Sequence, residues 1–447
     1  MQGKHEVAIV GGGISGCALL YILSRYSNIK SVVLLEKYGQ LAPLNSSPRA
    51  NSQTLHCGDI ETNYTLEKAA QVKRLANMIV RYSVLHPEAE KALHSWPKMV
   101  LGVGEEEVAY VQQRHEEFAS VFPYMQLWDA DRIAAIEPHV AEVDGRRRPE
   151  AIVASGCQDE VCAVDYALLA ESFVTHSVNS SCDTQVHLNT QVKTIQSLEE
   201  GFKLETPQGD FYASYVVVSA GPHSLLFAHR MGQGLEYSIL PVGGSFYHVP
   251  KRVNSKIYTV QNKKLPFAAI HADPDIVSPD YTRLGPTALL LPKLERYKSG
   301  SIMEFVEALK PDRAVLKAFW SLVKDTTIRH YMLKNLAFEV PGLRERLFLK
   351  DARKILPGLK LEDLRFAKGI GGLRPQVIDR KKGELMLGAA TIRSDKGALF
   401  NLTPSPGATN CLGNAYLDAL EVVKFLDRQL DRQRIVDELL SGEDVAS

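Results

Sequence analysis

The chain has 447 residues, of which 45% are hydrophobic and 23% charged, a composition typical of a globular protein with two or three domains. Its 52 Lys and Arg balance its 52 Asp and Glu, so the net charge gives no reason to expect a nucleic-acid partner. No run of about 20 apolar residues predicts a membrane span. Because a predicted strand begins near residue 7, we expect no secretion signal.

The cysteines are scattered and form no CxxC pair, so we expect neither a metal site nor a disulfide framework. Reduced thiols that pack as small apolar side chains, in a cytosolic protein, are the simplest interpretation. The six are Cys17, Cys57, Cys157, Cys162, Cys182 and Cys411.

Residues 5–37, "HEVAIVGGGISGCALLYILSRYSNIKSVVLLEK", predict a strand, a glycine turn, a helix and a second strand. Gly11, Gly13 and Gly16 form a GxGxxG motif: the first permits a tight turn, the second lets the backbone approach a pyrophosphate, and the third lets the helix pack on the sheet. Glu36 ends the second strand, where a carboxylate can accept hydrogen bonds from a ribose diol. The unit therefore predicts dinucleotide binding.

The middle of the chain predicts a mixed α+β region, and glycine-rich turns return near its end, in "GIGGLRPQ" and "TPSPGATN". Apolar spacing predicts helices at 67–86, 166–178 and 411–430 and helical segments between 302 and 335. It predicts strands at 245–249 and 267–272 and a hairpin around Gly209 that leads into the buried strand "VVVSAG".

Five motifs in order, GxGxxG with Glu36, "NSQTLHCG", "VVVSAG", "GGLRPQ" and "SPGATN", resemble the flavoprotein oxidoreductases of the D-amino-acid-oxidase type. Within that group, "NSQTLHCGDIETNYT", "PVGGSFYHV", "LPFAAIHADPD" and "TPSPGATNCL" resemble the malate:quinone oxidoreductase family, in the form found in ε-proteobacteria. The L-2-hydroxyglutarate oxidases are the next nearest. The resemblance runs from residue 7 to about residue 425.

This resemblance implies an α/β plus α+β fold, with a discontinuous Rossmann-type FAD-binding domain and a mixed β-sheet domain that caps the substrate. We assign residues 1–80, 150–225 and 346–430 to the FAD domain and residues 81–149 and 226–345 to the cap. Residues 431–447 are expected to form a C-terminal tail.

The polar stretch 47–64 lacks helical and strand periodicity, and the resemblance places it beside the flavin, where Gln53 or His56 could also face the substrate. The alternative is a solvated surface loop with Asx and Ser turns. The resemblance and the glycine motif together give the cofactor-binding set Gly11, Gly13, Gly16, Glu36, Lys37, Asn51, Ser52, Gln53, Val192, Ala220, Gly221, Gly372, Ser405, Gly407, Ala408 and Thr409. FAD is expected to be non-covalent.

The family reaction takes a hydride and a proton from a 2-hydroxy acid, so it needs a base and a cationic carboxylate clamp. By resemblance His271 is the base, oriented by a nearby acid such as Asp273 or Asp275, and Arg374 is the clamp. Taken alone, His271 is a structural histidine and Arg374 a surface arginine. For the second carboxylate of a dicarboxylate, the candidates are Gln53, Tyr247, Arg283 and Thr287.

The turn 403–410 resembles the one that opens the last helix against the flavin, where backbone amides stabilise negative charge; simple helix capping is the alternative. One departure concerns Gly243, which stands where related oxidases often carry Arg in a Pro-x-Arg-Gly motif. This departure favours the malate:quinone pattern over the hydroxyglutarate one.

Residues 313–360 contain eleven Lys or Arg against four Asp or Glu, with interleaved apolar side chains (Phe319, Trp320, Leu322 and Tyr331). Such a stretch can lie on the inner face of the cytoplasmic membrane and admit a quinone, or it can form ordinary surface helices. We thus expect oxidation of (S)-malate to oxaloacetate with FAD and a quinone. The alternatives are an L-2-hydroxyglutarate dehydrogenase or oxidase, and a flavin-carrying binding partner without turnover.

Overall fold

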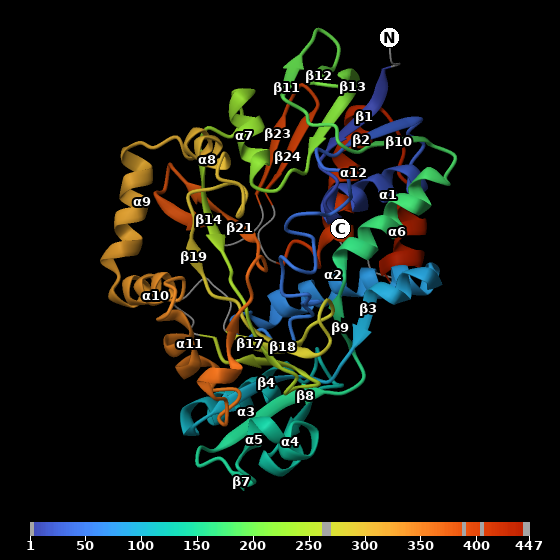
Figure 1. The fold of residues 1–447 in the computed structure, drawn as a ribbon. Coiled ribbons are helices and arrows are strands. Elements are labelled where there is room, and N and C mark those ends of the chain that lie inside the picture. The colour runs from blue at the N-terminus through green and yellow to red at the C-terminus, as the bar shows by residue number, and fades with distance from the viewer. Residues whose placement is uncertain (1–3, 262–269, 387–389, 403–405, 441–447) are drawn as a thin grey trace.

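Figure 1 shows the computed structural model of the chain, which describes residues 4–261, 270–386, 390–402 and 406–440. Three large sheets organise the described part of the chain, beside two two-stranded ones, β3 (Leu93–Ser95) with β9 (Val161–Val164) and β6 (Glu142–Val143) with β7 (Arg146–Arg147). The first sheet has a parallel core in the order β10 (Asp183–His187), β2 (Ser31–Leu35), β1 (His5–Val10), β13 (Gly209–Val218) and β24 (Ala398–Leu402). Its antiparallel strands are β11 (Thr194–Ser197), β12 (Phe202–Thr206) and β23 (Ala390–Ser394).

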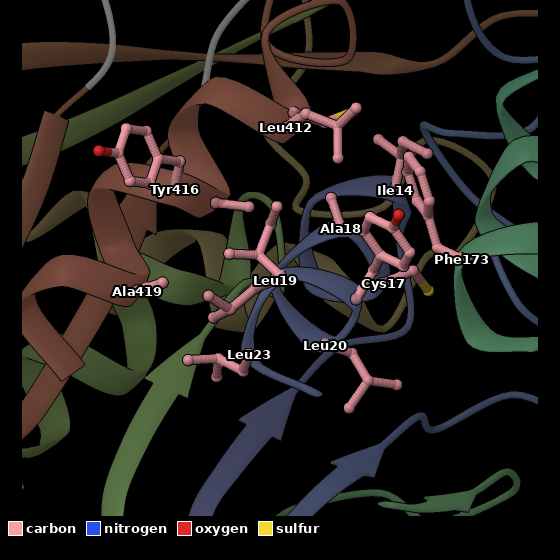
Figure 2. Packing of buried hydrophobic residues seen from close by; sticks show 14 of the residues in the cluster. Ile14, Cys17, Ala18, Leu19, Leu20, Leu23, Phe173, Leu412, Tyr416 and Ala419 are labelled. Atoms are coloured by element: carbon pink, nitrogen blue, oxygen red, sulfur yellow. The ribbon is translucent and has the colours of Figure 1, made fainter. Parts of the chain in front are cut away.

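Helix α1 (Ile14–Tyr26) is buried on nearly all sides, because α6 (Tyr166–Val178) and α12 (Cys411–Phe425) pack against it. Figure 2 shows this contact, in which Leu19 and Leu23 of α1 lie in one apolar cluster with Tyr416 of α12. A largely apolar helix surface, interrupted in α1 only by two serines and Arg25, is typical of a helix enclosed by other elements. The packing therefore fixes the glycine turn that precedes α1.

The second sheet is the capping sheet. Its order is β20 (Arg365–Phe366), β15 (Tyr247–Pro250), β18 (Tyr281–Gly285), β17 (His271–Pro274), β16 (Lys256–Thr259), β4 (Lys98–Val103), β8 (Ile152–Cys157) and β5 (Gln126–Trp128). The third sheet, β19 (Leu289–Leu290), β14 (Tyr237–Gly243), β21 (Leu373–Asp379) and β22 (Glu384–Met386), lies between the other two, as Figure 1 shows.

The remaining helices cover these sheets. Helices α8 (Ser301–Leu309), α9 (Arg313–Lys324), α10 (Thr326–Ala337) and α11 (Arg344–Ala352) follow one another along one side of the molecule (Figure 1). The others are α2 (Leu66–Leu85), α3 (Glu105–Phe118), α4 (Ala130–Ile136), α5 (Pro138–Ala141), α7 (His223–Arg230) and α13 (Arg432–Ile435). No described helix combines the length and hydropathy that crossing a bilayer requires.

The predicted α/β plus α+β fold class is confirmed, and all six cysteines are free and buried. The predicted domain division differs from the structure in three places. Strand β8 pairs with β4 and β5, so residues 152–157 belong to the capping sheet and not to the FAD domain. Strand β20 pairs with β15, so residues 365–366 belong to the capping sheet as well. Residues 431–440 are not a tail, because Ile435 and Leu439 are fully buried in the core around α1. Residues 267–269 of one predicted strand lie outside the described part.

Candidate active site

A cavity of about 1020 Å³ lies where the carboxyl ends of β1, β2 and β13 face the loop 42–56 and strand β21. Ligands of open α/β sheets bind at this edge, where the strand order leaves a crevice. Most of the predicted cofactor residues line the cavity: Gly11, Gly13, Glu36, Lys37, Asn51, Ser52, Val192, Ala220, Gly221, Gly372, Gly407, Ala408 and Thr409. Ser405 lies outside the described residues.

The glycine turn leaves no room for side chains. Gly11 has φ +112°, and a Cβ there would lie 2.6 Å from the Ser219 carbonyl oxygen. A Cβ on Gly16 would lie 2.0 Å from the Gly11 carbonyl oxygen, so Gly16 does not line the cavity but lets α1 approach the turn. The turn therefore presents bare backbone at the cavity, next to the N-terminus of α1.

Glu36 is held at the cavity by two backbone amides. Gly12 N–H donates to its Oε2 at 2.7 Å and Tyr38 N–H donates to its Oε1 at 2.9 Å. Burial raises the pKa of Glu36, and the two amides act in the opposite direction. Next to it, Lys37 forms an ion pair with Glu295, which also lines the cavity.

The polar loop is held by its own side chains. The Asn51 amide donates to the carbonyl oxygens of Asn45 at 3.1 Å and Ser47 at 2.8 Å, and its Oδ1 accepts from Gln53 N–H at 2.8 Å. Gln53 is fully buried with φ +53° and does not line the cavity. Its amide donates to Asp275 Oδ1 at 2.8 Å, so it joins the loop to the capping sheet instead of facing a ligand.

The turn before α12 contacts this loop. Thr409 Oγ1 accepts from His56 N–H at 3.1 Å and lies 3.0 Å from the Tyr166 hydroxyl. On the other side, a Cβ on Gly372 would lie 2.4 Å from the Ala50 carbonyl oxygen. Segments from both ends of the chain thus meet around residues 50–56.

Arg374 of β21 lines the cavity and is half-buried. Burial lowers the pKa of its guanidinium, while the phenols of Tyr64, Tyr258 and Tyr331 oppose this shift. None of these neighbours is a carboxylate, and a guanidinium stays charged in proteins. The site therefore offers a cation whose planar donors can receive a carboxylate.

His56 also lines the cavity, and its Nδ1 lies 2.6 Å from Glu61 Oε1. The other oxygen of Glu61 accepts from Gly58 N–H at 2.9 Å, and the carboxylate is buried. The pair places an oriented imidazole at the cavity wall. His56 was predicted as a possible substrate contact and Glu61 was not, although the five-residue spacing within one polar loop was a usable signal.

His271 is fully buried and does not line the cavity in the described part of the chain. Its Nδ1 lies 2.5 Å from Asp273 Oδ2, and its Nε2 has no hydrogen-bond partner among the described residues. Burial lowers its pKa to about 4, opposed by Asp273. The ring stacks on Tyr258, with centroids 4.6 Å apart and planes at 6°. The Tyr258 hydroxyl in turn lies 2.8 Å from Oγ1 of Thr54, a residue that lines the cavity.

The other predicted substrate ligands do not reach the cavity. Tyr247 packs on the far face of the capping sheet: its ring stacks on Phe348 and its hydroxyl donates to the Phe338 carbonyl oxygen at 2.9 Å. Successive side chains of a strand point to opposite faces of the sheet, so His248, which follows Tyr247 in β15, points to the cavity side. There its Nε2 lies 3.0 Å from Asp275 Oδ2.

Arg283 and Thr287 have structural partners as well. Arg283 is fully buried, stacks 4.4 Å from the centre of the Phe246 ring and donates to the Pro48 carbonyl oxygen at 3.2 Å. Thr287 Oγ1 accepts from Ser245 N–H at 3.0 Å. Neither residue lines the cavity.

Similar solved structures identify the fold. The L-α-glycerophosphate oxidase of Mycoplasma pneumoniae, solved with FAD bound, has 19% identity and a TM-score of 0.63 over 96% of each chain. The glycine oxidase of Geobacillus kaustophilus has 18% identity and a TM-score of 0.62 over 94% of this chain and 95% of that one. The fold is that of the FAD-dependent oxidoreductases.

Sequence comparison gives the family. The model of the malate:quinone oxidoreductase family (Mqo) matches residues 3–439, and the chain belongs to this family. It is 47% identical to a probable malate:quinone oxidoreductase of Campylobacter jejuni, over 98% of this chain and 100% of that one. It is 43% identical to the malate:quinone oxidoreductase of Helicobacter pylori strain 26695, over 99% of each. The predicted family resemblance is confirmed.

Proposed function

We propose that the protein uses FAD to oxidise (S)-malate to oxaloacetate and passes the electrons to a membrane quinone. The observation that supports this most directly is Arg374, a guanidinium among phenols at the wall of a cavity that also contains the glycine turn. The names of the family and of its relatives supply the substrate and the acceptor.

The residues present fit FAD. The bare backbone at Gly11 and Gly13 would hold the pyrophosphate, and Glu36 retains acceptor capacity for the ribose diol. Residues 50–52 and Gly372 would hold the ring, because the close approach of Gly372 to Ala50 leaves only backbone there. When bound, FAD supplies the hydride acceptor.

Arg374 would bind one carboxylate of malate through two parallel N–H donors. This contact fixes the orientation of the C–H bond that is broken, and the surrounding tyrosines leave the guanidinium charge uncompensated until the anion arrives. None of the four residues predicted for the second carboxylate lines the cavity. Arg296 does line the cavity, and we assign it to the second carboxylate of the substrate.

The substrate hydroxyl must lose a proton, and the two imidazoles differ in position. His271 has a free Nε2, and the Asp273 carboxylate at its Nδ1 favours the tautomer in which Nε2 accepts. We therefore retain His271 as the base; because it lies against Tyr258 and does not line the cavity, the substrate hydroxyl would have to reach it past the cavity wall. His56, with Glu61, lies closer to the cavity and would bind the substrate hydroxyl or carboxylate.

The alternative substrate is L-2-hydroxyglutarate, which is one methylene longer. The space that an arginine side chain would need at Gly243 is occupied: a Cβ there would lie 2.4 Å from Leu291 Cδ1 and 2.9 Å from Arg296 Nη1. Arg296 reaches this position from another segment and donates to the Gly244 carbonyl oxygen at 2.7 Å. The relatives named for malate favour the shorter dicarboxylate.

A surface near the site fits a membrane. Helices α9 and α10 carry apolar side chains that are exposed to solvent. The exposed fraction is 69% for Trp320, 65% for Leu316 and 58% for Leu333. The segment 313–360 carries eleven Lys or Arg against four Asp or Glu, which suits an anionic bilayer. Tyr331 of the same helix α10 lies near Arg374, so a lipid-bound quinone would approach close to the substrate site. The side chain of Leu322, one of the predicted apolar residues of this stretch, lies outside the described part.

Anaerobic flavin reduction tests the function. Addition of (S)-malate to purified protein reconstituted with FAD should bleach the visible flavin absorption, and L-2-hydroxyglutarate should do so at least about tenfold more slowly, the cost of one extra methylene in a fitted pocket. Stopped-flow absorbance measures both. Faster bleaching by hydroxyglutarate, or none by malate, would contradict the proposal.

Replacing Arg374 by Lys should raise KM for malate and lower kcat together, reducing kcat/KM about 100-fold, because a point charge does not fix the carboxylate plane. Steady-state assays with a soluble quinone measure this. Arg147→Lys, at an exposed arginine, is the control and should leave both constants unchanged. Loss of FAD with normal kinetics after reconstitution would show that Arg374 serves the cofactor.

Replacing His271 by Asn should lower the rate constant of flavin reduction by roughly 100-fold, because the proton acceptor is lost. His56→Asn should instead act mainly on the malate Kd, measured from the concentration dependence of the same reaction. If His56→Asn abolishes reduction while His271→Asn does not, the base is His56.

Trp320→Ser should weaken binding to vesicles that contain phosphatidylglycerol roughly tenfold, because a large apolar side chain no longer enters the bilayer. Vesicle flotation measures this. Val84→Ser, at a side chain of α2 that is 77% exposed, is the matched control and should have no effect. Equal binding of the wild type and Trp320→Ser would place the membrane contact elsewhere.

A further inference from the structure

One face of the capping sheet carries charged residues in a row across neighbouring strands. Lys98 of β4 pairs in register with Lys256 of β16, and Asp273 of β17 pairs with Arg283 of β18. The register of β16 and β17 sets Tyr258 opposite His271 and Ile257 opposite Ala272, so Lys256 lies opposite Asp273 two residues along, on the same face as His271. Four charged side chains thus share a buried face.

Lys256 connects this row to the cavity wall. It is fully buried, and its Nζ lies 3.0 Å from Asp273 Oδ1. The same Nζ donates to the Ser52 carbonyl oxygen at 3.2 Å and to Thr54 Oγ1 at 3.1 Å. Ser52 and Thr54 both line the cavity, so one ammonium group holds the wall and the carboxylate together.

Asp273 uses its other oxygen for His271, with Oδ2 2.5 Å from Nδ1. We propose that Lys256 is a positioning residue that fastens the Asp273–His271 pair to the loop lining the cavity and keeps this imidazole neutral, ready to accept a proton. The inference rests on the proposed function, because it gives the neutral imidazole its role. Lys256 itself touches neither substrate nor reacting atoms.

The charges that face His271 give the direction of the effect. Asp273 on its own strand favours the protonated ring, whereas Lys256 from β16 and Arg283 from β18 favour the neutral ring, and burial favours the neutral ring most. Tyr258, stacked on the ring, is neutral because its pKa lies well above the ordinary value. Without the Lys256 charge, Asp273 acts on His271 with less opposition, and protonation becomes easier.

The test compares Lys256→Met with the wild type, both loaded with FAD and selectively ¹⁵N-labelled at histidine, with His271→Asn used to assign the signal. In the wild type the His271 ring should stay neutral down to about pH 5. In Lys256→Met its titration should move up by about one to three pH units. In the pH profile of kcat/KM, the fall in activity on the acidic side should likewise move to higher pH.

Two variants separate charge from structure. Lys256→Arg keeps the charge and should restore the wild-type titration. Lys98→Met removes an equally buried lysine in the adjacent strand, whose partner is Asp59 at 2.6 Å, and should leave the His271 titration in place even if the protein is less stable. Where Lys256→Met does not fold, Lys256→Gln, which can still donate but has no charge, takes its place.

An unchanged His271 titration in Lys256→Met or Lys256→Gln would overturn the inference, as would an equal shift in Lys98→Met. The titration needs no turnover. A wild-type protein that fails to oxidise malate therefore contradicts the proposed function alone, and the NMR result still decides the role of Lys256.

Discussion

The buried charges on the capping sheet constrain the rest of the site, because a charge removed from water costs several kcal/mol unless it is paired and hydrogen-bonded. Their partners come largely from the polar loop. Asp59 pairs with Lys98, the Ser52 carbonyl and Thr54 accept from Lys256, and Gln53 donates to Asp275. The loop and the sheet therefore fold against each other, and the cavity wall forms only where they meet.

This constraint explains how a segment without regular structure can present an ordered surface. Asn51 and Gln53 use their side chains on neighbouring backbone and on the cap, so the local chain direction is fixed by tertiary contacts instead of helix or strand propensity. At the other end of the loop, the His56 N–H donates to Thr409 Oγ1, and this bond links the loop to the start of α12. The loop joins the two layers that enclose the cavity.

The local parts of this arrangement could be predicted from sequence. Gly11, Gly16 and Glu36 act within one strand–turn–helix–strand unit, so spacing alone defined their geometry. Tyr247 shows what spacing could not define: which face of β15 points to the cavity depends on its register with β18, a long-range pairing. For the same reason the roles of Lys98 and Lys256 were missed, although a lysine at the start of an apolar strand was the available signal.

Arg374 differs from these lysines in a way that bears on its function. Lys98 and Lys256 have carboxylate partners in the folded chain, which neutralise their charges where the cap contacts the loop. Arg374 has phenols as neighbours, which add polarity without neutralising it. An internal carboxylate at this point would stabilise the fold but would compete with an anionic substrate. With no carboxylate among the neighbours described for it, the guanidinium would keep its charge available for the proposed anionic ligand.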